Sequence, residues 1–506
     1  MPVSEPAMLP LDDHNQTLVN NTHPPGWKNP EPQGRYNLVV VGAGTAGLVS
    51  AAGAAALGAR VAMIERHLMG GDCLVYGCVP SKALLRASRA AYEAAHSGEF
   101  GVHLTNPPRL EFSEAMERMR RLRAQISFHD SAQRFTKLGV DVYLGQAKFI
   151  SRNALEVAGT RLKFSKAIVA TGARAAAVPV PGLTETGYLT NETVFSLTRC
   201  PASLIVIGAG PTGCELAQAF RRFGADVSIV SMDPRVLPRE DADAAAILHQ
   251  QLEREGIRMF LGAQVRQAQS TSGGKTVVFD RGQGEEQVTA EDILVAVGRA
   301  PNIEGLDLET AGVQYHAKGV SVDDHLRTSN PRIFAAGDIC SSYQFTHAAE
   351  ALARIALQNA LFFGRKKASA LMIPWCTYTD PEIAHVGFYE NEAQKRSLQV
   401  ETITLKFDGN DRAIVDGDTE GFLRVHFNQA NGLILGATLV SQHAGESIGE
   451  LVLAMHRKMK VSELGGIIHP YPTQAEIIKR LGDASMRTRL KPWMRNLLEK
   501  LFSLRR

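Results

Sequence analysis

Short apolar runs that lead into helix-forming segments organise most of the chain. LVVV at 38–41 and LIVI at 204–207 are continuously apolar, and each is followed by a glycine-rich turn, a helix-forming segment and another apolar run. Runs of this length that alternate with helices predict buried parallel strands joined by crossover helices. From Met372 onward the pattern changes to alternating strand positions with two helical stretches. The sequence therefore predicts an α/β protein with two doubly wound units and a C-terminal α+β domain.

Both doubly wound units open with the glycine spacing of a dinucleotide-binding turn. The glycines let the backbone approach a pyrophosphate, and the helix that follows directs its N-terminus at it. In the first unit the second strand ends in Glu65, where a carboxylate bonds a ribose hydroxyl. Two such Rossmann-like units predict two bound dinucleotides. The glycines are Gly42, Gly44 and Gly47 in the first unit and Gly208, Gly210 and Gly213 in the second.

A pair of cysteines, Cys73 and Cys78, lies in GGDCLVYGCVPSKALLR at 70–86. Residues five apart in a straight helix rise about 7.5 Å along the axis, beyond the roughly 7 Å Cα separation that a disulfide tolerates. The segment must therefore bend, and Gly77 permits the bend. Pro80 suits the first turn of the helix that follows, and Lys82 places a cation on that turn.

These features predict a redox-active pair. A thiol near a helix N-terminus and a lysine has a lowered pKa, and a pair in bent backbone is more reducible than a relaxed bridge. A zinc site is the alternative, but it needs two further Cys or His at ligand spacing, and none is nearby in the sequence. The remaining cysteines are scattered, as in proteins of a reducing compartment, and are Cys200, Cys214, Cys340 and Cys376.

The 70–86 segment resembles the redox-active stretch of the class I flavoprotein disulfide reductases, the family of dihydrolipoamide dehydrogenase, glutathione reductase and mercuric reductase. The resemblance extends over nearly the whole chain from residue 34. It implies that the first unit binds FAD, that the second binds NAD(P)H, and that the C-terminal domain forms a homodimer whose second subunit completes the active site. The expected parts are a flexible N-terminal arm (1–33), an FAD-binding domain (34–187 and 303–371), an NAD(P)-binding domain (188–302), a dimerisation domain (372–484) and a basic amphipathic helix (485–506).

The resemblance also assigns catalytic roles. It implies that a hydride passes from NAD(P)H through FAD to the Cys73–Cys78 disulfide. Cys78 is then the thiolate that stacks on the flavin, and Cys73 is the outward nucleophile. Lys82 is expected near the flavin N5, paired with Glu215.

Further residues match positions at which the family holds its cofactors. Asp338 follows an apolar strand and is expected to bond the ribityl chain of FAD. A helix that opens near Thr346 and His347 is expected to direct its N-terminus at the isoalloxazine, where the helix dipole stabilises negative charge. The other positions expected at the cofactors are Gly71, Ala147, Thr171, Gly172 and Gly298.

The end of the second unit's second strand bears on the choice of nucleotide. An NAD enzyme usually has an acidic residue there for the ribose 2′-hydroxyl, whereas this chain has Ser231 with Arg235 nearby. A small polar residue with an arginine suits a 2′-phosphate, so the sequence favours NADPH. NADH stays open, because Asp233 is within reach of the ribose.

The clearest departure from the family lies in IIHPYPTQAE at 467–476. The family has a proton-shuttling histidine where this chain has Tyr471, while Glu476 keeps its place and His469 lies two residues earlier. A tyrosine with a pKa near 10 is a poor base at pH 7, but its hydroxyl can donate a hydrogen bond or approach the thiolates around a soft metal. Mercuric reductases have a tyrosine in this region. This chain has no cysteine after Cys376 to match their C-terminal pair, however, and no cysteine before Cys73 to match the pair of their N-terminal metal-binding domain, which we expect to be lacking.

Composition limits the partners and the location. A net charge of +3 over 506 residues is too small to favour nucleic acid. The chain has no apolar run of the length of a membrane span and no N-terminal basic region followed by an apolar core, so a cytoplasmic protein is predicted. Residues 1–33 are rich in Pro, Asn and Asp without periodicity, which predicts a poorly ordered arm whose end Trp27 pins to the body.

The last residues form a second unusual segment. MRTRLKPWMRNLLEKLFSLRR at 486–506 has seven Lys or Arg against one Glu, with Trp493 and several leucines at roughly helical spacing. A basic amphipathic helix of this kind makes peripheral contact with an anionic membrane surface or packs on its own dimer.

The predicted function is an FAD-dependent NAD(P)H:disulfide oxidoreductase that reduces a small disulfide or dithiol substrate or a soft metal ion, similar to mercuric reductase. Three alternatives stay open: an Hg(II) reductase proper, a diaphorase or quinone-reducing flavoenzyme that uses the cysteines little, and a non-catalytic binding subunit that keeps FAD for structure.

Overall fold

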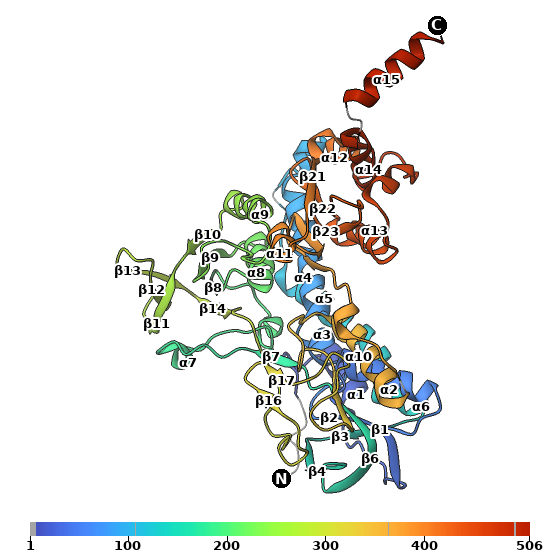
Figure 1. Ribbon diagram of the computed structural model, residues 1–506. Coiled ribbons are helices and arrows are strands. Elements are labelled where there is room, and N and C mark those ends of the chain that lie inside the picture. Colours follow the sequence, from blue (N-terminus) through green and yellow to red (C-terminus); the bar gives the residue numbers. More distant parts are fainter. Residues whose placement is uncertain (1–6, 107, 363, 490–491, 506) are drawn as a thin grey trace. The chain divides into compact units, whose positions relative to one another are not determined.

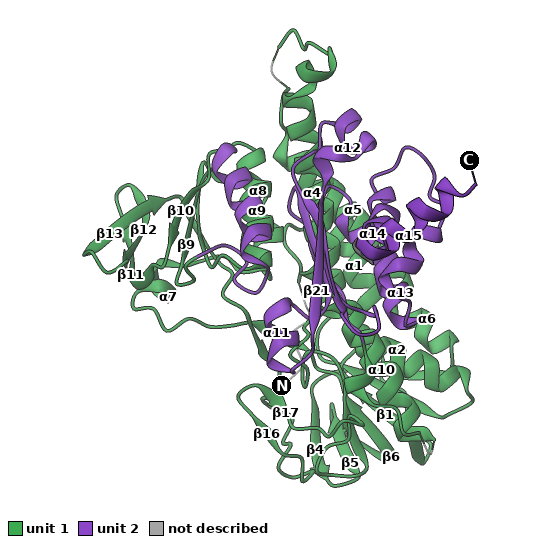
Figure 2. Ribbon diagram, turned by 45° about the horizontal axis from the view of Figure 1, so that its top comes forward, with its two compact units in different colours: residues 1–234, 255–371 green, residues 235–254, 372–506 purple. Residues whose placement is uncertain are grey.

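The computed structural model describes residues 7–106, 108–362, 364–489 and 492–505 (Figure 1). The chain divides into two compact units (Figure 2). Unit 1 consists of residues 1–234 and 255–371, and unit 2 consists of residues 235–254 and 372–506.

The main sheet of unit 1 is organised around β1. β1 pairs in parallel with β2 on one side and β6 on the other, with Val41 opposite Ile64 and Val169. β3 continues the parallel sheet beyond β2, and β18 pairs in parallel with β6. β4 and β5 complete it as an antiparallel extension of β6. The strands are β1 (Arg35–Val41), β2 (Val61–Glu65), β3 (Val140–Leu144), β4 (Ala147–Ser151), β5 (Ala154–Val157), β6 (Thr160–Val169) and β18 (Ile333–Ala335).

Both faces of this sheet are buried, which explains the continuous apolar run in β1. Leu38 and Val40 belong to one apolar core, and Val39 and Val41 belong to another. Helices α2 (Thr45–Ala56) and α10 (Thr346–Leu361) pack against each other on the first face (Figure 1). Full burial of a valine or leucine side chain stabilises a fold by about 1.5–3 kcal/mol, so this strand anchors the unit.

The remaining helices of unit 1 include the pair that carries the two cysteines. The α-helices are α1 (Asp13–Thr22), α3 (Gly71–Val75), α4 (Cys78–Ala95), α5 (Phe112–Ser127), α6 (Ala132–Lys137), α7 (Leu183–Thr186) and α8 (Pro211–Arg222). The 3-10 turns are η1 (Ser97–Phe100), η2 (Phe128–Asp130), η3 (Val194–Ser196) and η4 (Ala368–Ala370).

A second parallel sheet in unit 1 has the order β10-β9-β8-β14 and is followed by the antiparallel sheet β11-β12-β13. Both sheets contribute side chains to one apolar core. Their strands are β8 (Ser203–Ile207), β9 (Asp226–Ser231), β10 (Arg258–Leu261), β11 (Gln264–Thr271), β12 (Gly274–Asp280), β13 (Glu285–Ala290) and β14 (Asp292–Val295). Two short antiparallel pairs join β7 (Ala173–Ala175) to β15 (Arg299–Pro301) and β16 (Tyr315–His316) to β17 (Gly319–Val320).

Unit 2 is built on an antiparallel sheet with the order β19-β20-β23-β22-β21. Its strands are β19 (Trp375–Thr377), β20 (Glu382–Gly387), β21 (Val400–Lys406), β22 (Phe422–Asn428) and β23 (Ile434–Ser441). Its helices are α9 (Ala242–Arg254), α11 (Glu390–Lys395), α12 (Asp411–Asp416), α13 (Ala444–His456), α14 (Glu476–Arg489) and α15 (Pro492–Ser503), with 3-10 turns η5 (Phe407–Gly409) and η6 (Val461–Gly466).

Residues 235–254 belong to unit 2 because polar contacts fasten them to its sheet. The buried carboxylate of Glu240 accepts hydrogen bonds from Trp375 Nε1 at 2.7 Å and from the Tyr389 hydroxyl at 2.6 Å. Arg424 on β22 donates to Asp241 and Asp243.

The N-terminal segment differs from the poorly ordered arm that we expected. Residues 13–22 form helix α1, and Leu18 and Val19 on it are buried in an apolar cluster. The composition misled the prediction because these polar residues stabilise the helix and are not loop residues. The Asp12 side chain caps the helix by accepting a hydrogen bond from the Asn15 N–H, and Asn15 is buried. Trp27 does pin the segment, since its Nε1 donates to the Val142 carbonyl at 3.2 Å.

The basic tail is not one separate helix that begins at residue 485. Helix α14 already starts at Glu476 and continues to Arg489, and α15 follows after residues 490–491, which lie outside the described residues. Among the helices that the structure describes, none has the length and apolar character needed to cross a bilayer.

Candidate active site

The first glycine turn joins β1 to α2, and packing requires glycine at two of its positions. A Cβ on Gly42 would lie 2.4 Å from the Ala170 carbonyl oxygen, and one on Gly47 would lie 1.8 Å from the Gly42 carbonyl oxygen. Gly44 is the N-cap of α2 and provides no side-chain cap for the helix. Gly71 passes close by, because its Cβ would lie 2.7 Å from Gly44 Cα. The turn therefore leaves the N-terminus of α2 open to the pyrophosphate of a dinucleotide.

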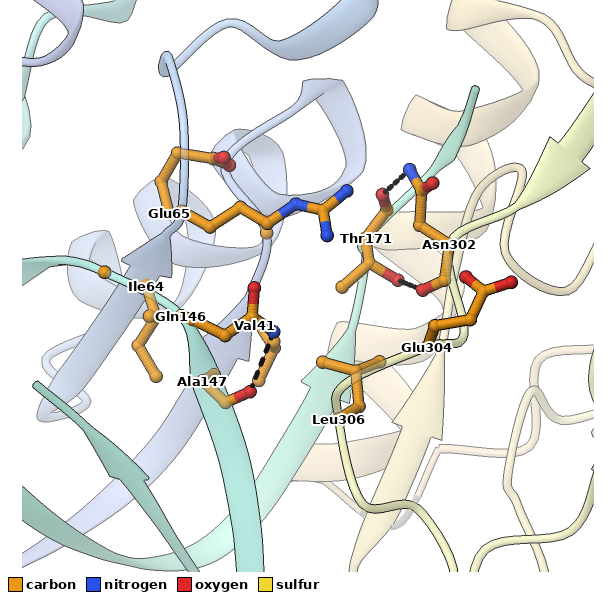
Figure 3. A pocket seen from close by; sticks show the side chains of 12 residues that line it. Val41, Ile64, Glu65, Gln146, Ala147, Thr171, Asn302, Glu304 and Leu306 are labelled. Carbon is orange, nitrogen blue, oxygen red and sulfur yellow. Dashed lines mark hydrogen bonds between the residues drawn. The ribbon is translucent and has the colours of Figure 1, made fainter. Parts of the chain in front are cut away.

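A pocket at the ends of β1 and β2 brings four of the predicted cofactor residues together: Gly42, Glu65, Ala147 and Thr171 (Figure 3). Burial raises the pKa of the Glu65 carboxyl, which accepts hydrogen bonds from the backbone N–H of Ala43 at 2.7 Å and of His67 at 2.8 Å. A carboxylate held in this way at the end of the second strand suits a ribose hydroxyl. The acidic group and the open helix end together fit FAD.

The turn at Thr171 and Gly172 is fixed by a residue that the sequence did not single out, Asn302. Thr171 Oγ1 donates to the Asn302 carbonyl and Asn302 Nδ2 donates to the Thr171 carbonyl, both at 2.9 Å (Figure 3). Gly172 adopts φ +67°, and its carbonyl accepts from the Asn302 N–H. Asn302 lines the same pocket, so it belongs to the site.

The predicted bend between the two cysteines is confirmed. Helix α3 ends at Val75 and α4 begins at Cys78, with Gly77 as the N-cap. A Cβ on Gly77 would lie 2.8 Å from Asp72 Oδ2 and 2.9 Å from the Asp72 carbonyl oxygen, so only glycine fits this bend.

The two thiols differ in acidity. A hydrogen bond from Cys73 lowers the pKa of Cys78 to about 6, with further help from Thr346 and the charge of Lys82. The same bond raises the pKa of Cys73. Cys78 Sγ lies 3.2 Å from Thr346 Oγ1 at the start of α10. The geometry therefore stabilises a thiolate at Cys78 and a thiol at Cys73.

Helices α4 and α8 are joined at two points, together named the α4–α8 brace. At the first, Lys82 Nζ donates to Glu215 Oε2 at 2.8 Å, as the family resemblance implied, and the Glu215 side chain is buried. At the second, the Arg222 guanidinium lies over the Tyr92 ring at 4.1 Å from its centroid. Arg222 is also in a buried ion pair of 2.7 Å with Glu255. The brace connects the cysteine-bearing helix to the helix of the second glycine turn.

Arg299 links two acidic residues near the redox segment. Its guanidinium lies 3.2 Å from Asp72 and 3.6 Å from Asp338, the predicted ribityl partner. Burial raises the pKa of Asp338, and the Arg299 charge opposes that rise. The sequence feature that could have identified Arg299 is its position directly after Gly298, which adopts φ +115°.

His347 is exposed and stacks on Phe345 with ring centroids 5.5 Å apart.

The second glycine turn repeats the packing of the first. A Cβ on Gly208 would lie 2.5 Å from the Ala296 carbonyl oxygen, and one on Gly213 would lie 2.0 Å from the Gly208 carbonyl oxygen, whereas a Cβ on Gly210 meets nothing within 4 Å. Helix α8 starts with Pro211 and has no side-chain cap, so its N-terminus can also accept a pyrophosphate.

The residues that bear on nucleotide choice have local partners. Ser231 ends β9, is buried, and accepts a hydrogen bond from the Asp233 N–H at 3.2 Å. Arg235 Nη2 donates to the carbonyls of Pro238 and Glu240, both at 2.8 Å. These bonds anchor the Arg235 guanidinium to its own loop in unit 2.

The tail residues lie in unit 2, where Tyr471 is an exposed donor. Its hydroxyl donates to Asp411 Oδ2 at 2.7 Å, and this bond raises the pKa of Tyr471. Glu476 opens α14 and lies 3.6 Å from Arg480. The His469 side chain is 6% exposed and paired with Glu450 at 3.1 Å, so it does not present a free imidazole in place of the family's histidine. Tyr471 can therefore donate a hydrogen bond at neutral pH but is a weak base.

Two dinucleotide-binding turns on either side of a dithiol define an NAD(P)H-dependent flavoprotein oxidoreductase. The family model described as pyridine nucleotide-disulphide oxidoreductase matches residues 36–353, and that of its dimerisation domain matches residues 373–481, so the chain belongs to this family. The family uses FAD and NAD(P)H, and the dimerisation domain supports a homodimer.

Relatives with two different named activities are similar to the chain over most of its length. The chain is 33% identical over 448 residues to a mercuric reductase of Staphylococcus aureus, covering 88% of this chain and 82% of that one. It is 33% identical over 468 residues to a dihydrolipoyl dehydrogenase of Thermus scotoductus, covering 89% and 97%.

Two solved structures share the fold at lower identity. One is LpdA of Mycobacterium tuberculosis, with a TM-score of 0.82 at 27% identity over 88% of this chain and 99% of that one. The other is RclA of Escherichia coli, an HOCl-induced flavoprotein disulfide reductase, with a TM-score of 0.79 at 28% identity over 88% and 99%.

Proposed function

We propose that this protein is an NADPH-preferring flavoprotein disulfide reductase in which the Cys73–Cys78 pair reduces a small disulfide or a soft metal ion. The observation that carries the proposal is the Cys78 thiol at the bend, next to Thr346 and near the Lys82–Glu215 pair. When bound at the first glycine turn, FAD supplies the two-electron chemistry between the nicotinamide and the disulfide. Glu65, Gly44, Thr171 and Asp338 would hold it.

The cysteines perform the exchange with a disulfide substrate in two steps. Cys73 loses its proton and attacks one substrate sulfur, so that a mixed disulfide forms, the substrate S–S bond breaks and the first thiol leaves with that proton. The Cys78 thiolate then attacks Cys73 Sγ, the internal disulfide closes, and the second thiol leaves with a proton from water. Tyr471 of the second subunit would donate a hydrogen bond to the departing sulfur, in the place of the family's histidine.

Soft metal ions are the second substrate class for the same dithiol. The relatives include mercuric reductases, and RclA has been solved as a complex of Cu(II), which is a borderline rather than a soft ion. The pair suits soft ions once Cys73 gives up its proton to the bound metal, because soft thiolates select soft metals.

An anaerobic NADPH titration of the FAD-loaded protein, followed by visible absorbance, tests the proposal. We expect a long-wavelength band from the Cys78 thiolate beside the ring, which glutathione disulfide, lipoamide or Hg(II) discharges within the mixing time when each is added in turn. Reduction without that band, with reoxidation by quinone or oxygen only, would instead identify a diaphorase.

The proposed preference for NADPH rests on Ser231, because this residue ends β9 where an NAD enzyme usually has a carboxylate. Ser231→Asp is expected to lower the ratio of kcat/KM for NADPH over NADH at least about tenfold, equal to roughly 1.4 kcal/mol, because a carboxylate repels a 2′-phosphate and accepts from a 2′-hydroxyl. Steady-state kinetics with both nucleotides measures the ratio. Asp226→Asn, at the exposed start of β9, is the matched control and should leave the ratio unchanged. A wild-type protein that prefers NADH would contradict the proposal.

We also propose a cytoplasmic protein whose α15 rests on an anionic membrane surface. The helix lies beyond the matched dimerisation domain, and Trp493, Leu497, Leu501 and Phe502 on it are exposed. At helical spacing these side chains form one face, and Arg495 and Lys500 fall at its two edges. Apolar residues flanked by cations are typical of helices that lie in the interface of anionic bilayers.

Vesicle co-sedimentation of the full chain tests the membrane contact. Binding is expected to vesicles that contain phosphatidylglycerol, and to weaken at least about tenfold in the double variant Leu497→Ser with Leu501→Ser, since each leucine contributes roughly 1.5–3 kcal/mol of burial. Asn496→Ala on the polar side is the control. If vesicles are not bound and the double variant dissociates the homodimer in light scattering, the helix packs on its own dimer instead.

A further inference from the structure

The N-terminal segment, defined here as residues 8–22, packs against the residues between the two cysteines. This segment precedes the part of the chain that the family model matches, which begins at residue 36. Met8, Leu18 and Val19 form an apolar cluster with Leu74 and Val75, the two residues that follow Cys73, and with Leu68. All these side chains are at most 9% exposed.

Polar contacts reach the same stretch of backbone. Arg123 on α5 donates from Nη1 to the Val75 carbonyl and from Nη2 to Asn15 Oδ1 on α1, both at 2.7 Å. Arg123 and Asn15 are 1% and 2% exposed, so the bonds are protected from water. The Tyr76 hydroxyl donates to Met8 Sδ at 3.5 Å. Each of the three residues after Cys73 is therefore in contact with the N-terminal segment or with Arg123.

Asn15 is itself fixed in orientation. Its Nδ2 donates to the Pro10 carbonyl at 2.8 Å and its backbone N–H donates to Asp12 Oδ1 at 2.8 Å. These two bonds orient the Asn15 amide oxygen toward Arg123. Burial lowers the pKa of Arg123 to about 10, and a buried guanidinium needs hydrogen-bond acceptors to offset its loss of hydration.

We propose that the N-terminal segment sets the thiol–disulfide equilibrium of the Cys73–Cys78 pair by holding the bend between the cysteines, with Asn15 as a positioning residue that acts through Arg123. A backbone already ordered in the bent form loses little conformational entropy when the S–S bond closes, so the disulfide is favoured. If the bend is less ordered, closing the S–S bond loses more conformational entropy. The equilibrium then shifts toward the dithiol. The inference rests on the proposed redox role of the pair.

The experiment is a glutathione titration of the full-length, FAD-loaded protein without oxygen. In the exchange, the S–S bond of glutathione disulfide breaks, the Cys73–Cys78 bond forms, and two glutathione thiols leave with the two protons of the pair. Acid quenching, alkylation and mass spectrometry of the peptides that hold Cys73 and Cys78 give the equilibrium constant, with no need for turnover or for a known substrate.

Asn15→Ala and Leu18→Ala are each expected to lower the constant about tenfold, which moves the potential of the pair about 30 mV more positive. Asn15→Asp keeps an oxygen for Arg123 but loses the donor to the Pro10 carbonyl, so it should restore the wild-type constant only in part. Gln16→Ala, on the exposed side of α1, is the matched control. Leu423→Ala, in the core of unit 2, controls for a general loss of stability and should lower Tm while leaving the constant unchanged.

Two results would overturn the inference in distinguishable ways. If Asn15→Ala and Leu18→Ala lower Tm as Leu423→Ala does but keep the wild-type constant, the segment serves stability only. If the wild-type pair forms no disulfide at any glutathione ratio, the proposed function itself fails and the inference fails with it.

Discussion

Replacing Cys73 by serine is expected to lower the rate of disulfide reduction at least about a thousandfold, because a serine hydroxyl neither attacks a disulfide nor forms the mixed disulfide. FAD should stay bound, since Cys73 belongs to the bend and not to the pocket around Glu65. The Cys78 thiolate should also persist, so its long-wavelength absorbance should be visible without prior reduction. Stopped-flow assays with NADPH and glutathione disulfide or lipoamide measure the rate.

The matched control for this prediction is Cys200→Ser, which changes a partly exposed thiol outside the redox pair. It should leave the rate within twofold of wild type, as roughly expected of a surface change. NADPH oxidation with a quinone acceptor should continue in Cys73→Ser. Disulfide reduction at the wild-type rate in that variant would assign the outward role to another group, and loss of FAD would show that Cys73 is structural.

Substituting alanine for Gly47 is expected to cost at least about 3 kcal/mol of stability and to release FAD, because its Cβ would lie 1.8 Å from the Gly42 carbonyl oxygen. The clash is with backbone, which cannot move aside without separating α2 from β1. A loss of this size corresponds to a fall in Tm of roughly 6–12 °C for a domain of 150–250 residues. Differential scanning calorimetry and the ratio of flavin to protein absorbance measure the two effects.

The second glycine turn offers the matched comparison. In Gly213→Ala the Cβ would lie 2.0 Å from the Gly208 carbonyl oxygen, so NADPH binding should be lost while FAD is retained. Gly449→Ala on α13 adds a Cβ with nothing within 4 Å and should be neutral or stabilise slightly. A Gly47→Ala protein with full FAD content and wild-type Tm would show that the turn tolerates a side chain.

Local features could be predicted from the sequence because they depend on neighbours in the chain. The apolar run of β1 and the glycine spacing after it determine a strand, a turn and a helix between residues 35 and 56. The spacing of Cys73 and Cys78 was enough to require the bend at Gly77, since helix geometry excludes the alternative. The pairing of Lys82 with Glu215 followed from the family resemblance and is present in the structure.

Contacts between distant parts of the chain could not be predicted in the same way. Asn15 and Arg123 are 108 residues apart, and only the fold brings them together. The Pro- and Asn-rich composition of the N-terminus predicted disorder, although its few apolar residues are enough to cover α3. Residues 235–254 look like part of a nucleotide unit in sequence, but Glu240 fastens them to Trp375 and Tyr389. Partners of this kind require three-dimensional information.

The α4–α8 brace limits how this enzyme can be recombined. A chimera that takes its nicotinamide half from a relative imports a new α8, and the contacts of Lys82 and Tyr92 with α8 are then lost unless positions 215 and 222 are kept as glutamate and arginine. The two halves are therefore not interchangeable modules, even though each has its own glycine turn and its own core. Grafts designed to change the nucleotide preference should exchange the loop after β9 and keep α4 and α8 together from the same parent protein.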